Sequence, residues 1–329
     1  MLDLNKIFNF YYGWWKNIDK FIFFLILFLF SLGLFFSLVS TSIIASDKLN
    51  TNTYYFFIKH LLFILLGVFI LITFSAIDQK RLFYFSKYLF LTFFIFLALV
   101  PFIGVEVKGS ARWIDLPGIP SFQPIEILKP FLIIMISTVF TLNSRKNIYF
   151  KYLLSFLIIF PVILFLISQP DIGQTILILL TWFSLIFISG INLLFFFVFF
   201  ALTFSILIYL IIYVTKFSYI KNRLLSFIDP DTGNNYQSER ASEAISNGGF
   251  FGQGIGEGTL KSDVPEAHTD YIISVISEEF GVVAIILILL LFLIFIYMVF
   301  KKISFETDDR IKLILIGSIS LILMQATIH

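Results

Sequence analysis

Three ionisable side chains, Glu266, His268 and Asp270, lie within five residues at the start of a long apolar run. A carboxylate or imidazole at such a point can act as a general base toward a hydroxyl nucleophile. If Thr269 is the N-cap of the following helix, Asp270 occupies the first turn, where the helix dipole stabilises its anion. It is then a weak base unless desolvation or crowding by Glu266 opposes the dipole. The alternative is an acidic helix N-terminus without catalytic work.

Two further acids, Glu278 and Glu279, follow one to two turns later in the same apolar run. Ionisable groups at membrane depth cost several kcal/mol unless they are paired or hydrated, so they mark functional sites by default. This pair argues against treating the whole acidic segment as solvated surface. A glycine-rich stretch at 248–258 precedes it, and residues 239–247 are expected to form a short amphipathic helix.

A second group of charges lies at 107–130, where Lys108 and Arg112 provide cations. Its glycines and prolines predict a structured loop that is neither helix nor strand. Glu126 and Lys129 follow with i,i+3 spacing, which places them on one helix face. The segment suits a cationic phosphate pocket, since arginine is a bidentate donor. Interfacial anchoring, with Trp113 as a belt aromatic, is an equally weighted alternative.

A third polar motif, QPDIGQT at 169–175, separates two apolar runs. Asp171 is expected to cap the helix that follows. The less favoured alternative is that Gln169 and Asp171 form a polar site facing the 107–130 group. His268 has no partner at metal-ligand spacing and the chain has no cysteine, so no dedicated metal site is predicted.

The elements that position these residues follow from composition. Of the 329 residues, 59% are hydrophobic and only 13% are charged, and the mean hydropathy is +0.98. A soluble domain has about 25% charged residues. The composition therefore excludes a cytosolic enzyme, a disordered chain and a disulfide scaffold, and it predicts an all-α polytopic membrane protein. A net charge of +2 gives no reason to expect nucleic acid as a partner.

About nine transmembrane helices are expected, because each span needs about 20 apolar residues. They are predicted at 21–44, 56–77, 84–104, 126–142, 152–168, 173–190, 192–214, 272–300 and 311–329. More than half of the 23 Lys and Arg residues fall in four segments: 1–20, 78–87, 143–151 and 301–312. The positive-inside rule then places the N-terminus in the cytoplasm. Two long outer loops result, at about 104–125 and at about 215–271 between spans 7 and 8.

Taken together, the motifs resemble the SEDS family (shape, elongation, division and sporulation). They occur in family order as KGSARWI, QPIEILK, QPDIGQT, YQSERA, GGFFGQGIGEG and PEAHTDYIISVISEEFG. The resemblance runs from about Gly33 to the end, so residues 1–329 are interpreted as a single SEDS-type membrane domain. GEGTLK followed by PEAHTD is more similar to the division-associated FtsW branch than to the elongation-associated RodA branch.

The resemblance implies a peptidoglycan glycosyltransferase that polymerises lipid II at the outer face of the bacterial inner membrane. Transfer would invert the anomeric centre and release polyprenyl pyrophosphate, with Asp270 as the catalytic base. The residues expected to bind substrate are Lys108, Arg112, Trp113, Gln123, Glu126, Lys129, Gln169, Asp171, Glu266, His268, Glu278 and Glu279. A divalent cation, Mg²⁺ or Mn²⁺, is a further expectation. The implied partners are a class B penicillin-binding protein transpeptidase and other division proteins at the septum.

The sequence departs from the family pattern at three points. Ile125 stands where the family usually has serine, and Tyr271 where phenylalanine is commoner. The family has ten spans with a further outer loop before the tenth, so a chain ending at its ninth span is interpreted as truncated. Two alternative functions stay open: a flippase or transporter of lipid-linked precursors, and a non-catalytic division scaffold. Neither alternative requires an acid at the outer start of a helix.

Overall fold

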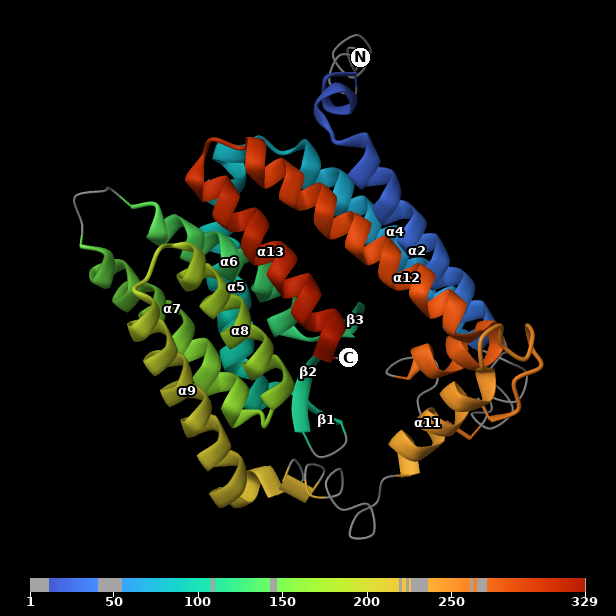
Figure 1. Cartoon of the computed structure of the whole chain (residues 1–329). Coiled ribbons are helices and arrows are strands. Elements are labelled where there is room, and N and C mark those ends of the chain that lie inside the picture. Colours follow the sequence, from blue (N-terminus) through green and yellow to red (C-terminus); the bar gives the residue numbers. More distant parts are fainter. Residues whose placement is uncertain are drawn as a thin grey trace. The chain divides into compact units, whose positions relative to one another are not determined.

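The chain is helical for most of its length and forms two compact units in a computed structural model (Figure 1). The structure describes residues 12–40, 55–107, 110–142, 147–218, 221–222, 225, 236–260, 263–264 and 271–328. Unit 1 comprises Met1–Ile77 and Leu225–Met298, and unit 2 comprises Asp78–Leu224 and Val299–His329.

Unit 1 contains two packed apolar helices, α2 (Lys20–Ser40) and α4 (Tyr55–Ala76). It also holds α11 (Tyr236–Gly248) and most of α12 (Ile272–Phe305), whose last residues belong to unit 2. The helix predicted at 239–247 is confirmed as α11, which begins three residues earlier. Phe35 and Phe36 of α2 contact the ring of Phe280 in α12, with centroids 5.8 and 5.6 Å apart.

Unit 2 is a helical bundle of α5 (Gln79–Ile103), α6 (Pro124–Phe140), α7 (Ile148–Ser168), α8 (Ile172–Ile188), α9 (Leu193–Tyr213), a 3₁₀ turn η1 (Thr215–Phe217) and α13 (Asp309–Ile328). Its core includes Leu128, Trp182 and Leu185, all nearly inaccessible. Helix α13 packs on α6 and α8. A Cβ at Gly317 would lie 2.7 Å from Cγ2 of Ile133, so the missing side chain permits this close approach.

Membrane character is clear from these helices. Within the described residues, seven helices are long and apolar enough to cross a membrane: α2, α4, α5, α7, α9, α12 and α13. Helix α8 is a shorter apolar helix. Each of the predicted spans corresponds to a helix in the structure. The number of crossings and the orientation of the N-terminus stay predictions.

The prediction that the 107–130 segment contains no strand before the helix that carries Glu126 is wrong. The chain forms a three-stranded antiparallel sheet here, with β1 (Val105–Val107), β2 (Ser110–Leu116) and β3 (Ile119–Phe122) in the order β1-β2-β3. Pro117 and Gly118 connect β2 to β3, and Gly118 has φ +81°. Proline followed by a positive-φ glycine is typical of a tight turn. Pro120 is tolerated because β3 is an edge strand.

A glycine-rich loop packs backbone to backbone against an interruption in α12. Gly281 has φ +76° and ψ −178° inside the helix, which leaves nearby carbonyl groups without helical partners. The amides of Gln253 and Gly254 donate to the carbonyls of Glu278 (2.8 Å) and Glu279 (3.1 Å). In return, Val282 N donates to the Gly249 carbonyl at 3.0 Å. The loop therefore replaces helical hydrogen bonds lost at Gly281.

Two glycines of this loop provide a matched test of that packing. Gly252 and Gly256 have nearly equal φ angles, +81° and +82°. A Cβ at Gly252 would overlap the Glu279 carbonyl, whereas nothing lies within 4 Å of one at Gly256. Both alanine variants carry the left-handed backbone cost of about 1–2 kcal/mol. We expect Gly252→Ala to lower the apparent Tm by roughly 4 °C or more beyond Gly256→Ala. Equal Tm values would contradict the close approach.

Candidate functional site

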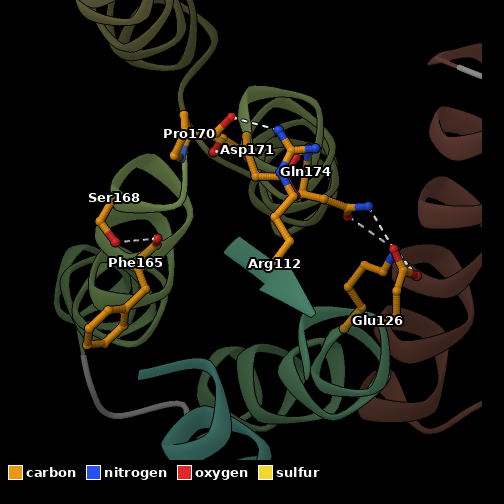
Figure 2. Close-up of polar contacts among 9 residues, drawn as sticks. Arg112, Glu126, Phe165, Ser168, Pro170, Asp171 and Gln174 are labelled. Carbon is orange, nitrogen blue, oxygen red and sulfur yellow. Dashed lines mark hydrogen bonds and ion pairs between the residues drawn. The ribbon is translucent and has the colours of Figure 1, made fainter. Parts of the chain in front are cut away.

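The 107–130 and 169–175 segments meet in unit 2 through Arg112 (Figure 2). Its Nε lies 3.6 Å from Oδ2 of Asp171, and its Nη2 donates to the Pro170 carbonyl at 3.0 Å. Oδ1 of Asp171 also accepts from the Gln174 amide at 3.3 Å, which confirms the predicted cap of α8. Asp171 therefore both caps α8 and faces the first group, whereas the Gln169 side chain bonds to α5.

Burial and a neighbouring cation act in opposite directions on the pKa of the Asp171 carboxyl. This side chain precedes α8 and is largely buried, and burial raises the pKa of its carboxyl above the ordinary value. The Arg112 guanidinium acts in the opposite direction and is the next largest influence. The side chain of Arg112 is 30% exposed. The guanidinium is thus held by Asp171 and by the Pro170 carbonyl, in a side chain that is not fully buried.

A second set of polar contacts joins α6, α8 and α13. Lys129 is buried, and its Nζ lies 2.5 Å from Oε2 of Glu126, as the i,i+3 spacing predicts. The same ammonium contacts Oε1 of Gln174 at 3.3 Å and Oε1 of Gln325 at 3.2 Å. Nε2 of Gln174 donates to Oε1 of Glu126 at 2.7 Å. Gln174 therefore links the Arg112–Asp171 contact to the Glu126–Lys129 pair. We call six residues the α6–α8 network: Arg112, Glu126, Lys129, Asp171, Gln174 and Gln325.

The other predicted residues of unit 2 have less direct positions. Gln169 ends α7 and donates to the Leu97 carbonyl at 3.1 Å while almost fully buried, so it holds α7 to α5. Gln123 precedes α6 without a capping side-chain bond. Trp113 is 37% exposed on β2 and is accessible for stacking. Ile125, in the family's serine position, is buried in the apolar core.

In unit 1, Glu278 and Glu279 are 0% and 1% exposed, so both acids of the apolar run are buried. Oε1 of Glu278 accepts from Nδ2 of Asn247 at 3.1 Å and from the Leu260 amide at 2.8 Å. A Cβ at Gly258 would lie 2.9 Å from the same carboxylate. Hydrogen bonds from Asn247 of α11 and from the Leu260 amide thus compensate the desolvation of Glu278.

Three contributors were missed from the sequence: Gln174, Gln325 and Asn247. Gln174 lies inside the QPDIGQT motif, and Gln325 is a polar residue late in an apolar span; both were available signals. Asn247 had no local signal, because its partner is 31 residues away.

Four predicted site residues, Lys108, Glu266, His268 and Asp270, lie outside the described residues, as does Thr269. Within the part of the chain that is described, no group of three or more His, Asp or Glu side chains is arranged to hold a metal ion. The divalent cation stays a prediction, and no step proposed below runs through it.

The sequence model of one family, described as "Cell cycle protein" and named for FtsW, RodA and SpoVE, matches residues 19–329. The chain belongs to this family. Curated FtsW relatives agree: "Probable peptidoglycan glycosyltransferase FtsW" of Caulobacter vibrioides is 35% identical over 184 residues, which is 56% of this chain and 46% of the relative. The protein of the same name from Haemophilus influenzae is 34% identical over 197 residues, or 57% and 48%. The chain thus spans about half the length of the curated relatives it matches.

Solved structures show the same fold as this FtsW, RodA and SpoVE family member. One, titled "Structural coordination of polymerization and crosslinking by a peptidoglycan synthase complex", aligns with TM-score 0.74 and 23% identity. The alignment covers 94% of this chain and 85% of that one. RodA of Thermus thermophilus aligns with TM-score 0.66 and 22% identity, over 95% and 84%. The predicted helical, polytopic membrane fold is therefore confirmed, with the small sheet at 105–122 as the exception.

The α6–α8 network predicts an asymmetric response to mutation. The Glu126 side chain is 38% exposed and that of Lys129 only 3%. Glu126→Gln leaves a buried ammonium without its carboxylate, and we expect a loss of about 3 kcal/mol. Lys129→Met removes the buried charge itself and leaves a carboxylate that water can reach, so the loss should be smaller. Apparent Tm values in detergent measure both.

The double variant completes this cycle. Glu126→Gln combined with Lys129→Met should be more stable than Glu126→Gln alone, because no unpaired charge is left in the bundle. Strictly additive losses would show that the two side chains are not coupled.

Proposed function

We propose that the protein is a peptidoglycan glycosyltransferase that polymerises lipid II into glycan strands. Family membership and the names of its FtsW relatives support this activity. The observation that carries it is the α6–α8 network, which holds the partly exposed side chain of Arg112 at the end of an apolar bundle. Such a group suits the anionic pyrophosphate of a substrate whose polyprenyl chain stays in lipid.

The proposed reaction needs one base and one anion-stabilising group. The 4-hydroxyl of an acceptor GlcNAc attacks C1 of the donor MurNAc, and Asp270 takes the hydroxyl proton. The C1–O bond to the pyrophosphate breaks, the anomeric centre inverts, and polyprenyl pyrophosphate leaves with the bonding electrons. Arg112, assisted by Lys108, stabilises the charge on the leaving group. Lys129 holds Glu126 and Gln174 in place.

The setting follows from the same proposal. The chain is a multi-pass membrane protein, and we infer that its N-terminus is cytoplasmic and that the reaction occurs on the outer face, at the division septum. A class B penicillin-binding protein is the inferred partner. The solved peptidoglycan synthase complex, which coordinates polymerization and crosslinking, supports this pairing because the fold of the aligned chain matches.

Polymerisation of fluorescent lipid II by the purified protein tests the function. We expect Asp270→Ala and Asp270→Asn to reduce glycan formation by about 10²–10⁴-fold, the usual contribution of a general base. Glu257→Ala is the matched control, because Glu257 is an exposed acid of the same sequence region. It should retain wild-type activity.

Three results would contradict the proposal. Polymer from both Asp270 variants at the wild-type rate would remove Asp270 as the base. No polymer from folded wild-type protein, with its transpeptidase partner present, would remove the glycosyltransferase activity. Transfer of lipid II between vesicle leaflets without polymer would favour the transporter instead.

A further inference from the structure

A cavity of about 620 Å³ lies at the end of unit 2 away from Arg112. It is lined by the last residues of α6 and α8 and the first residues of α7 and α13, among them Thr141, Ser189, Lys151 and Arg310. Lys151 is in the first turn of α7, and Gln169 follows its last residue. At 1.5 Å per residue these positions are roughly 27 Å apart. The cavity is therefore about one hydrocarbon thickness from the α6–α8 network.

Two cations that line this cavity have no acidic partner among the described residues. Lys151 is buried, and its Nζ donates to the Phe140 carbonyl at 2.9 Å. Nε of Arg310 donates to Oγ1 of Thr141 at 3.2 Å, and its guanidinium lies 5.1 Å from the ring centre of Phe83. Considering only described residues, no carboxylate lies within 4.0 Å of either group. The Phe140 carbonyl occupies one of the three ammonium donors, so two are left for another acceptor.

The two acids on the cavity wall already have other partners. Oδ1 of Asp308 accepts from the amide of Arg310 at 2.8 Å. Oδ1 of Asp309 lies 3.4 Å from Nζ of Lys312, and the Asp309 side chain is 81% exposed. A buried ammonium without a counterion is costly. An anion that enters the cavity would offset the desolvation of Lys151 and pair with Arg310.

The remaining wall is apolar. It includes Phe140, Leu142, Leu313 and Ile316, while Ile148 and Ile188 are 37% and 47% exposed. A ligand that fits must carry an anion beside hydrocarbon. Because α7 and α13 are both apolar enough to span a membrane, their ends lie at the depth of lipid headgroups.

We propose that this cavity binds an anionic phospholipid, with its phosphate between Lys151 and Arg310 and its acyl chains against Ile148 and Ile188. A phospholipid joins the two halves of the wall in one molecule, whereas free phosphate leaves the apolar half uncovered. The site lies in the leaflet opposite Arg112, which the positive-inside rule makes the cytoplasmic one. Basic pockets between helix ends on that side suit anionic headgroups. This site does not depend on the proposed glycosyltransferase activity.

Native mass spectrometry of the detergent-purified protein tests the site. Phosphatidylglycerol and phosphatidylcholine with the same acyl chains are added at equal concentration, and the bound fractions are compared. Wild type should retain phosphatidylglycerol preferentially. Lys151→Gln and Arg310→Gln should each reduce its retention about fivefold, the effect of one removed charge at a lipid surface. Lys87→Gln, an exposed cation of α5 outside the cavity, should change retention less than twofold.

Several outcomes would overturn the proposal. These are equal retention of the two lipids, an equal loss in Lys87→Gln, or displacement of phosphatidylglycerol by millimolar inorganic phosphate. If Lys151→Gln does not fold, Arg310→Gln carries the test, because that side chain is only partly buried. Its apparent Tm in the same preparation shows whether a loss of lipid reflects unfolding.

Discussion

A charge inside an apolar helix bundle must find its counterparts within the protein, and the arrangement of unit 2 follows from this constraint. Lys129 is almost inaccessible, yet its ammonium contacts side chains of α6, α8 and α13. Those helices must pack closely enough for the contacts to form. Gly317 permits the approach of α13, and the cap at Asp171 fixes where α8 begins. Asp171 and the Pro170 carbonyl in turn hold the partly exposed side chain of Arg112.

In unit 1, backbone polar groups must likewise find hydrogen-bond partners within the protein. The helix break at Gly281 would leave carbonyls of α12 without partners, and amides of the glycine-rich loop supply them. These hydrogen bonds require the loop backbone to lie close to the α12 backbone, and side chains at Gly248 or Gly252 would prevent this. The approach also buries Glu278 against Asn247 and the Leu260 amide. Glycine repetition here therefore serves packing around buried acids.

Local features were predictable from the sequence because they depend on spacing. The Glu126–Lys129 pair, the cap at Asp171 and the helix α11 follow from neighbouring residues. The partners of Gln174, Gln325 and Asn247 could not be predicted, because the tertiary packing of distant segments selects them. The strands at 105–122 could not be predicted from the glycines and prolines of this segment. Residues such as Pro117 and Gly118 occur in tight turns between strands as well as in irregular loops. Asp270 and its neighbours lie outside the described residues, so their role rests on the family pattern.

We propose that Arg112, positioned by Asp171, binds the pyrophosphate of lipid II. The dissociation constant of lipid II for Arg112→Ala and Lys87→Ala, measured in the same detergent, tests it most directly. Each variant removes one cation, and only Arg112 belongs to the α6–α8 network. Loss of a charge-assisted hydrogen bond predicts a Kd about tenfold weaker for Arg112→Ala, with Lys87→Ala close to wild type and both proteins folded by apparent Tm. Equal Kd values for the two folded variants would contradict the claim.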